Sequence, residues 1–449
     1  MNYMKKSKTS QLSGVQILAL GFAIVILIGA VILTLPISSK SGNATNFLDS
    51  LFTATSAVCV TGLVTLDTGT YWNEFGQVVI MLLIEVGGLG FMAFTTLLAI
   101  LLRRRITLRD RLIMQEAMNT FSIQGLVKMV ERIVLFTVLV QIIGGVLLAT
   151  QFIKDYGFLK GLYFGIFHSV SAFCNAGFDL FGGYSSVTSY STNAIVLITL
   201  SIIIIVSGLG FTVIIELLKY KTDRRLSTHT KLVLLMTSIL LFGGILFMFA
   251  LEYNNPETLG PMSIKNKILN AIFSGVSPRT AGFNSISLDK MTSGGKFLTI
   301  ILMYIGGSPG STAGGLKTAT FGIIVLTVVS VIKGREDTEL FGRRLSKELV
   351  YRAFAILMIS FSLVVVVTML LCITQPKEQF IDLLYEATSA FATVGLTTGV
   401  TQRLNFIGKI IIMITMYFGR VGPLTVALAL TNKRKNKGYR YPETKILIG

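Results

Sequence analysis

A short apolar segment that occurs four times is the feature that most constrains how this chain can fold. The first copy, Phe47 to Leu63, is too short to cross a bilayer, because a spanning helix needs about 20 apolar residues and shorter runs more often mark re-entrant segments. The other copies are 162–178, 267–283 and 380–396. Self-similarity at a nearly constant interval predicts that the chain is built from four versions of one structural unit.

The four copies also match position by position. Each ends in a glycine followed by Leu or Phe, and these glycines are Gly62, Gly177, Gly282 and Gly395. Ten residues before them stand Phe52, Phe167, Ile272 and Tyr385, and six residues before them stand Ser56, Ser171, Val276 and Ser389. The shared offsets predict that the four segments have the same local structure.

The composition is that of an integral membrane protein. Charged residues make up only 14% of the 449 residues, hydrophobic residues make up 52%, and the mean hydropathy is +0.72. A soluble chain carries nearer 25% charged residues. The three cysteines, Cys59, Cys174 and Cys372, lie in apolar stretches and show neither metal-ligand spacing nor a disulfide framework.

Each quarter of the chain consists of a long apolar run, the short run with its glycine loop, and a second long run. The expected spans are 15–35 and 75–102, 132–152 and 193–219, 230–251 and 297–332, and 350–373 and 406–430. The first is expected to be retained, because no cleavage site follows it. We therefore predict an all-α polytopic membrane protein with four pseudo-symmetric repeats of span, pore helix, filter loop and span around one central pore. The repeats are 1–115, 116–226, 227–342 and 343–449, the last with a cytoplasmic tail.

Charge in the connecting segments predicts the orientation. We count 27 Lys and Arg against 10 Asp and Glu on the side that holds the two termini and the three links between quarters, and 11 against 11 on the side of the glycine loops. Because an excess of Lys and Arg marks the cytoplasmic side, we expect a multi-pass protein of the cell membrane with both termini in the cytoplasm. The lipid bilayer and topology account for the basic charge, so no nucleic-acid partner is expected.

The glycine loops are typical of an ion pathway. A helix that enters the membrane and stops there points its partly negative C-terminal end at the centre, where it favours a cation. The residues before each glycine include no carboxylate, so backbone carbonyls are expected to replace the hydration shell of the ion. We take the loops to comprise Val60, Thr61 and Gly62; Asn175, Ala176 and Gly177; Thr280, Ala281 and Gly282; and Thr393, Val394 and Gly395. The alternative is that the glycines only form tight turns between packed helices.

With these four repeats, the chain resembles the Trk/Ktr/HKT superfamily of potassium transporters over essentially its whole length. The resemblance is greatest to the Ktr membrane subunits of the KtrB and KtrD type, with the KtrD type favoured. It implies that the four glycines form a selectivity filter that binds potassium through backbone carbonyls, and that glycine in all four loops goes with potassium preference. It also implies a homodimer with one pore per subunit, and a cytosolic ring of RCK-type regulatory subunits that bind ATP and ADP. The chain has one glycine per loop, whereas tetrameric potassium channels have the doubled glycine of TVGYG.

A gate is expected in the run 297–332, which is too long for one span and contains the sequence GGSPGSTAGG. We predict two half-helices joined by a loop inside the membrane, which has to face the pathway because lipid-exposed loops are not tolerated there. The gate residues are Gly306, Gly307, Ser308, Pro309, Gly310, Ser311, Thr312, Gly314, Gly315, Lys317 and Arg420. Arg420 is expected to hold the free carbonyls of the loop. The alternatives are two separate spans or close glycine packing for the loop, and a structural pair with Glu85 or with a helix-end carbonyl for Arg420.

Other classes of function find little support in the sequence. The chain shows no nucleophile and base set, no phosphate loop and no metal-ligand cluster, so an enzyme and a bound cofactor are not expected. We expect His168 to be a packed polar residue, and the glycines of 87–91 and 207–211 to allow close helix packing. The hypothesis is a potassium-translocating subunit with potassium as substrate. Sodium is left open as a coupling or activating ion. The alternative is a coupled secondary carrier for another cation or an organic solute.

Overall fold

In a computed structural model, which describes residues 14–90, 112, 115, 125–422 and 442, the chain is almost entirely helical. The first quarter holds α1 (Gly14–Thr34), η1 (Pro36–Ser38), α2 (Phe47–Cys59) and α3 (Glu74–Leu89). The second holds α6 (Leu126–Tyr156), α7 (Phe158–Cys174), η2 (Thr188–Tyr190), α8 (Ala194–Gly208) and α9 (Phe211–Asp223). The third holds α10 (Thr228–Glu252), α11 (Ile264–Val276), α12 (Ser293–Tyr304), α13 (Thr318–Ile332) and a hairpin of β1 (Glu339–Leu340) and β2 (Arg343–Arg344). The fourth holds α14 (Lys347–Thr374), α15 (Phe380–Ala392), α16 (Val400–Arg403) and α17 (Phe406–Val421).

The first helix of every quarter is long and apolar enough to cross a membrane. Among the described residues, four single helices meet this condition, and they are α1, α6, α10 and α14. The short apolar helices α2, α7, α11 and α15 follow them as the four expected pore helices. Of the expected repeat boundaries, 226/227 falls between α9 and α10 and 342/343 falls in the β1–β2 turn, whereas residue 116 lies outside the described residues. The chain is a multi-pass membrane protein.

The second helix of every quarter is interrupted, although a break was expected only in the third quarter: α12 stops at Tyr304, and α3, α8 and α17 stop at or close to a glycine. The expected span 193–219 is wrong as one helix, because α8 and α9 are bent by 97° at Leu209 and Gly210. Gly90, Gly210 and Gly422 have φ values of 86°, 91° and 95°, which a right-handed helix cannot contain. Gly90 and Gly210 therefore mark the ends of helices; an added Cβ would meet nothing within 4 Å at Gly90, whereas at Gly210 it would lie 2.6 Å from the Pro309 carbonyl oxygen. Residues 91–102 and 423–430 of the other expected spans lie outside the described residues.

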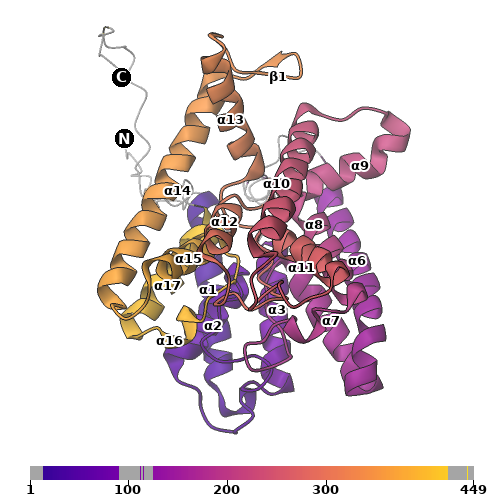
Figure 1. The fold of residues 1–449 in the computed structure, drawn as a ribbon, viewed down its shortest axis with the longest axis vertical. Helices are drawn as coiled ribbons and strands as arrows, with labels where there is room; N and C mark the ends of the chain where they lie inside the picture. The colour runs from indigo at the N-terminus through magenta and orange to yellow at the C-terminus, as the bar shows by residue number, and fades with distance from the viewer. Residues whose placement is uncertain (1–13, 91–111, 113–114, 116–124, 423–441, 443–449) are drawn as a thin grey trace, which may run out of the picture.

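Contacts between neighbouring quarters close the four units into a ring. The second helix of each quarter packs against the pore helix of the next: α3 on α7, α8 on α11, α12 on α15, and α17 on α2. Figure 1 shows the hairpin and α9 at one end of the molecule, and α16 and the segment that joins α1 to α2 at the other. The last quarter thus packs against the first, and one axis runs through the centre.

Local sequence signals explain where these helices begin and how closely they pack. Side chains cap α3, α8, α12 and α17 at the same position, where Asn73, Asn193, Thr292 and Asn405 accept hydrogen bonds from backbone N–H groups of the first turn. Gly87 does pack closely, because an added Cβ would lie 2.1 Å from the carbonyl oxygen of Val58 in the adjacent pore helix. These contacts place the second helices directly behind the glycine loops.

Candidate functional site

The four glycine loops share an unusual backbone conformation. The residue two before each glycine is left-handed although it is not glycine: Val60, Asn175, Thr280 and Thr393 have φ values of 57°, 58°, 78° and 51°. The glycines themselves, Gly62, Gly177, Gly282 and Gly395, have φ values of 91°, 69°, 80° and 94°. Positive φ at a β-branched residue is costly and persists where the surroundings impose it, which is common at functional sites. Alternation of the sign of φ also turns successive carbonyls toward the same side of the loop.

The carbonyls just before the glycines form a closed ring. An added Cβ at Gly62 would lie 2.3 Å from the oxygen of Ala176, and one at Gly177 would lie 3.0 Å from the oxygen of Ala281. At Gly282 and Gly395 the neighbouring oxygens, at 2.4 Å and 2.2 Å, belong to Val394 and Thr61. Each loop therefore presents a carbonyl to the glycine of its neighbour, and the fourth loop meets the first. A side chain at any of the four glycines would collide with this ring.

Each of the four loops also carries a buried side-chain oxygen without a hydrogen-bond partner among the described residues. In the part of the chain that the structure describes, Thr61 Oγ1, Asn175 Oδ1, Thr280 Oγ1 and Thr393 Oγ1 are buried and have no hydrogen-bond partner. Buried oxygens without a donor are costly unless something else compensates them. One such oxygen from each quarter, beside four carbonyls and the C-terminal ends of four pore helices, makes a site suited to a dehydrated cation. No group of three or more His, Cys, Asp or Glu with metal-ligand geometry occurs among the described residues.

Serine side chains position the loops from behind. Ser56 Oγ accepts a hydrogen bond from the N–H of Gly62 at 3.0 Å, and Ser389 Oγ accepts one from Gly395 at 3.1 Å. In the second quarter Ser171 donates to the carbonyl of Phe178 at 2.8 Å. In the third quarter Val276 occupies the equivalent position, and Ser277 donates to Phe283 in its place. The recurrence of serine six residues before the glycine was visible in the sequence, but its role was not.

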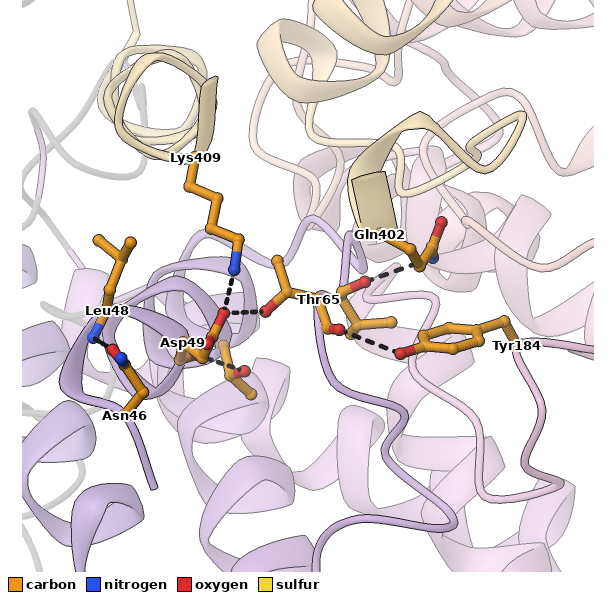
Figure 2. Close-up of polar contacts among 9 residues, drawn as sticks. Asn46, Leu48, Asp49, Thr65, Tyr184, Gln402 and Lys409 are labelled. Carbon is orange, nitrogen blue, oxygen red and sulfur yellow. Dashed lines mark hydrogen bonds and ion pairs between the residues drawn. The ribbon is translucent and has the colours of Figure 1, made fainter. Parts of the chain in front are cut away.

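The outer side of the first loop is held by polar contacts from two other quarters (Figure 2). Asp49, in the first turn of α2, accepts hydrogen bonds from Lys409 Nζ of α17 at 2.6 Å and from Thr65 Oγ1 at 2.9 Å. The Tyr184 hydroxyl donates to the Thr65 carbonyl at 3.0 Å. A similar ion pair joins Lys296 of α12 to Asp382 of α15 at 2.9 Å. Partly buried pairs of this kind lock neighbouring quarters together.

Two further carboxylates, Asp67 and Asp179, lie in the segments that follow the first and second loops. Asp67 accepts hydrogen bonds from the Thr70 N–H at 2.7 Å and from the Tyr184 N–H at 2.8 Å. Asp179 stands two residues after Gly177, and burial together with the nearby Asp67 charge raises the pKa of Asp179 to about 7. These acidic groups favour cations at this end of the molecule.

The expected intramembrane loop lies directly against the ring. α12 ends at Tyr304 and α13 begins at Thr318, so the run 297–332 is broken where the glycines are. An added Cβ at Gly314 would lie 2.6 Å from the carbonyl oxygen of Ala392, and one at Gly306 would lie 3.2 Å from Thr280 Cγ2. Gly315 packs against Ala392 as well.

Hydrogen bonds connect this loop to the break between α8 and α9. The Ser308 N–H donates to Gly208 at 3.0 Å, and the Phe211 N–H donates to Gly310 at 3.0 Å. The Pro309 carbonyl packs on Gly210. Asn175 of the second filter loop donates to Thr312 Oγ1 at 2.8 Å.

Other bonds close the loop on itself. Gly307 accepts from Thr318 at 3.0 Å, and the Ser311 hydroxyl donates to Ser308 at 2.7 Å. All ten positions of 306–315 are thus held in one folded arrangement.

Arg420 contacts the intramembrane loop, as expected. Its Nη1 donates to the carbonyl of Thr312 at 2.6 Å, and its Nη2 donates to the carbonyls of Gly87 and Gly88. Lys317 donates to the carbonyl of Ala313 within the loop. Arg420 therefore joins the loop to the broken end of α3, and one side chain connects three quarters.

Of the two alternative partners expected for Arg420, the structure shows helix-end carbonyls, those of Gly87 and Gly88 at the end of α3, and not Glu85. Glu85 Oε2 accepts hydrogen bonds from Gln141 Nε2 at 2.8 Å and from the Cys174 thiol at 3.3 Å. His168 is fully buried, with its Nδ1 2.7 Å from the Phe164 carbonyl and its ring stacked on Phe181. His168 is thus a packed polar residue, as expected.

Comparisons with known proteins assign this architecture to a family. The family model described as TrkH, cation transport protein, matches residues 13–438. The chain belongs to the TrkH family of cation transport proteins. Its relatives are transporters, not enzymes.

Two relatives and one solved structure show how far the similarity extends. The chain is 44% identical to the potassium/sodium uptake protein NtpJ of Enterococcus hirae, over 100% of both chains. It is 39% identical to the Ktr system potassium uptake protein B of Bacillus subtilis, over 97% of this chain and 96% of that one. The potassium transporter TrkH of Vibrio parahaemolyticus has the same fold, with a TM-score of 0.72 and 17% identity over 96% of this chain and 87% of that one.

The serine contacts lead to a test of the ring geometry. We expect Ser56→Ala and Ser389→Ala each to reduce discrimination between cations, because the glycine N–H loses its acceptor and the loop can shift. The control is Ser50→Ala, which removes a buried hydroxyl without a partner from the same helix as Ser56. The measurement is competition between cations during uptake into proteoliposomes. Equal discrimination in wild type, both variants and the control would show that these serines do not position the loops.

Proposed function

We propose that this chain is the potassium-translocating membrane subunit of a Ktr-type potassium uptake system. The observation that carries the proposal is the closed ring of four carbonyls with an unpartnered side-chain oxygen from each quarter. A ring of fixed oxygens can replace the hydration shell of a potassium ion. The printed names of the relatives, which include potassium uptake proteins, agree with this substrate.

Sodium is proposed as a second ion of the system. The name of the Enterococcus relative includes both potassium and sodium, which supports sodium as a coupling or activating ion. The basic links and termini support a location in the bacterial cell membrane with both termini inside. The organic-solute alternative gains no support, because the ring is tightly packed around its axis.

The function is tested by potassium uptake at limiting external potassium in cells that lack other uptake systems. We expect the wild type to restore growth, and Gly62→Ser and Gly282→Ser to weaken the preference for potassium over sodium, because the added Cβ collides with a neighbouring carbonyl. The control is Gly42→Ser, which also has positive φ but has nothing within 4 Å of the added Cβ. Failure of the wild type to take up potassium would contradict the proposal.

We also propose that the loop 306–315 is the gate. It fills the space beside the ring, and it is tied to the second quarter through Gly208 and Phe211 and to the fourth through Arg420. An ion that leaves the ring would meet this loop. Because these bonds are individually modest and lie outside the helices, we propose that the loop can be displaced without unfolding the helices around it.

The gate proposal predicts the effect of removing the Arg420 contacts. We expect Arg420→Ala to raise potassium flux several-fold, because the Thr312 carbonyl is released, and Arg420→Lys to give an intermediate flux, since a lysine cannot reach two sites as a fork does. Deletion of Gly307–Gly314 is expected to raise flux further. The measurement is potassium efflux from proteoliposomes with equal amounts of inserted protein. Wild-type flux in all three variants would exclude the loop as the main barrier.

Regulation is proposed to come from a partner. We propose that the protein works as a homodimer and that an RCK-type ring that binds ATP and ADP docks on the links 103–131, 219–231 and 333–348 and on the C-terminal tail. The structure does not describe some of these residues, namely 103–111, 113–114, 116–124 and, apart from residue 442, the tail after 432. Support comes from the exposed hairpin, where Phe341 is 52% exposed and Arg343 and Arg344 face solvent. The link 333–348 carries five basic and four acidic side chains, and Arg344 pairs with Asp337 at 3.1 Å, so we propose that Phe341 and Arg343 supply most of the contact with the partner.

Copurification with the ring tests the docking proposal. We expect Arg343→Ser with Arg344→Ser, in a chain truncated after Asn432, to lose the ring and the response of flux to ATP or ADP. The control is Lys265→Ser with Lys377→Ser, which removes two exposed charges near the first turns of α11 and α15, at the end of the molecule away from the hairpin. A variant that keeps both the ring and the response would show that the ring docks elsewhere.

A further inference from the structure

A buried carboxylate in the fourth pore helix has no role in the pathway described above. Glu386 lies in α15 and is completely buried. Its Oε2 accepts a hydrogen bond from the Thr397 hydroxyl at 2.7 Å, and its Oε1 accepts one from the Thr401 hydroxyl. A buried charge is costly unless hydrogen bonds compensate it, so its place needs a physical reason.

The two hydroxyls belong to the segment that follows the fourth filter loop. Thr397 stands two residues after Gly395, and Thr401 lies in the one-turn helix α16. We call 397–403 the rim segment. Its other end is held by Arg403, which forms a two-pronged ion pair with Glu378 at 2.7 Å and 2.8 Å and lowers the pKa of that carboxyl.

The rim segment also contacts the first filter loop. Gln402 Nε2 donates to the carbonyl of Val64 at 3.3 Å, two residues after Gly62 (Figure 2). A displacement of the rim segment would therefore shift both the fourth and the first filter loops. Among the described residues, Glu386 is the only side chain of α15 that hydrogen-bonds to the rim segment.

The hydrogen bonds of Glu386 have a specific consequence for the two threonines. Each carboxyl oxygen is bonded to a different hydroxyl, so one side chain holds Thr397 and Thr401 at the same time. An uncharged glutamine would fill the same volume but offer only one acceptor oxygen.

The position that Glu386 occupies, nine residues before the filter glycine, also holds a bridging side chain in the second quarter. Nine residues before the glycine stand Thr53, His168, Phe273 and Glu386. His168 Nε2 accepts a hydrogen bond from the N–H of Leu180 at 3.3 Å, so it too joins a pore helix to the segment after its loop. Thr53 bonds only to the Asp49 carbonyl of its own helix. The second and fourth quarters, which face each other across the ring, are thus braced from the same position.

We propose that Glu386 is a positioning residue that holds the rim segment against α15 and thereby sets the spacing of the Val394 and Gly395 backbone in the filter. Through this spacing it sets the affinity and selectivity for potassium. The inference rests on the proposed function. In the opposite quarter, His168 holds the segment after the second filter loop against α7.

The experiment compares variants at both ends of the contact. Potassium uptake by the full chain is measured in cells that lack other uptake systems, as KM, maximal rate and inhibition by sodium. The variants are Glu386→Gln, Thr401→Val, the two combined, and Thr401→Ser, which keeps the hydroxyl. The matched control is Thr53→Val, which removes a hydroxyl from the equivalent position of the first quarter. Inserted protein is quantified for each variant.

We expect Glu386→Gln and Thr401→Val each to raise KM about fivefold to tenfold and to increase sodium inhibition at an unchanged amount of protein, because each variant weakens the hydrogen bonding between α15 and the rim segment. The double variant is expected to be no worse than the single ones, because both act through one contact. Thr401→Ser and Thr53→Val are expected to match the wild type. A purely structural role would lower the amount of protein and leave KM and selectivity unchanged.

Two results would overturn the inference. One is an unchanged KM and selectivity in Thr401→Val, which is the deciding variant if Glu386→Gln fails to insert. The other is strictly additive effects in the double variant. If the wild type itself takes up no potassium, the proposed function fails. If the wild type and the variants all transport potassium normally, only the inference about Glu386 fails.

Discussion

The structure depends on one steric constraint, the close approach of four backbone segments at a single level. A carbonyl from each loop lies so near the glycine of the next that an added Cβ would stand 2.2–3.0 Å from its oxygen. Backbone of this kind at membrane depth is tolerated only where protein or a polar pathway surrounds it. The helices that enclose the loops, the serines behind them and the ion pairs across the quarters all serve to keep these four segments in register.

The second consequence of the ring is electrostatic. Oxygens accumulate at its centre, whereas Arg420 and Lys317 are bound to the loop beside it, through the carbonyls of Thr312 and Ala313. A cation is thus favoured in the ring and meets fixed positive charge next to it. Intramembrane charges of this kind are costly and usually functional. We propose that the balance between the two regions lets the pathway hold an ion before releasing it.

Periodicity and length were enough to predict the fourfold plan. The short segment from Phe47 corresponds to a helix that starts at that residue and ends at Cys59, and the glycine-rich stretch of 306–315 does interrupt its helix. The sequence also contained the signals for the bends at Gly90 and Gly210, but glycine in an apolar helix is compatible both with packing and with a break. Only the backbone angles distinguish the two.

The contacts that cross between quarters could not be predicted. Gln402 meets Val64, Lys409 meets Asp49, and Asn175 meets Thr312, although each pair is more than 100 residues apart in the chain. Their proximity follows from closure of the ring, which brings the last quarter against the first. Local patterns carry no information about such pairs. The contacts of Glu386 were missed for a similar reason, since Thr401 lies in a one-turn helix and Thr397 in the loop before it, and sequence periodicity reveals neither.

The central claim is that a dehydrated cation binds on the axis between the four glycines. The most direct measurement is anomalous diffraction from crystals grown in rubidium or thallium, which replace potassium and scatter strongly. The account predicts an anomalous peak at the level of the Thr61, Ala176, Ala281 and Val394 carbonyls, lost when sodium replaces the heavier ion. Saturating thallium with no peak at that level, and transport still intact in the same preparation, would contradict it.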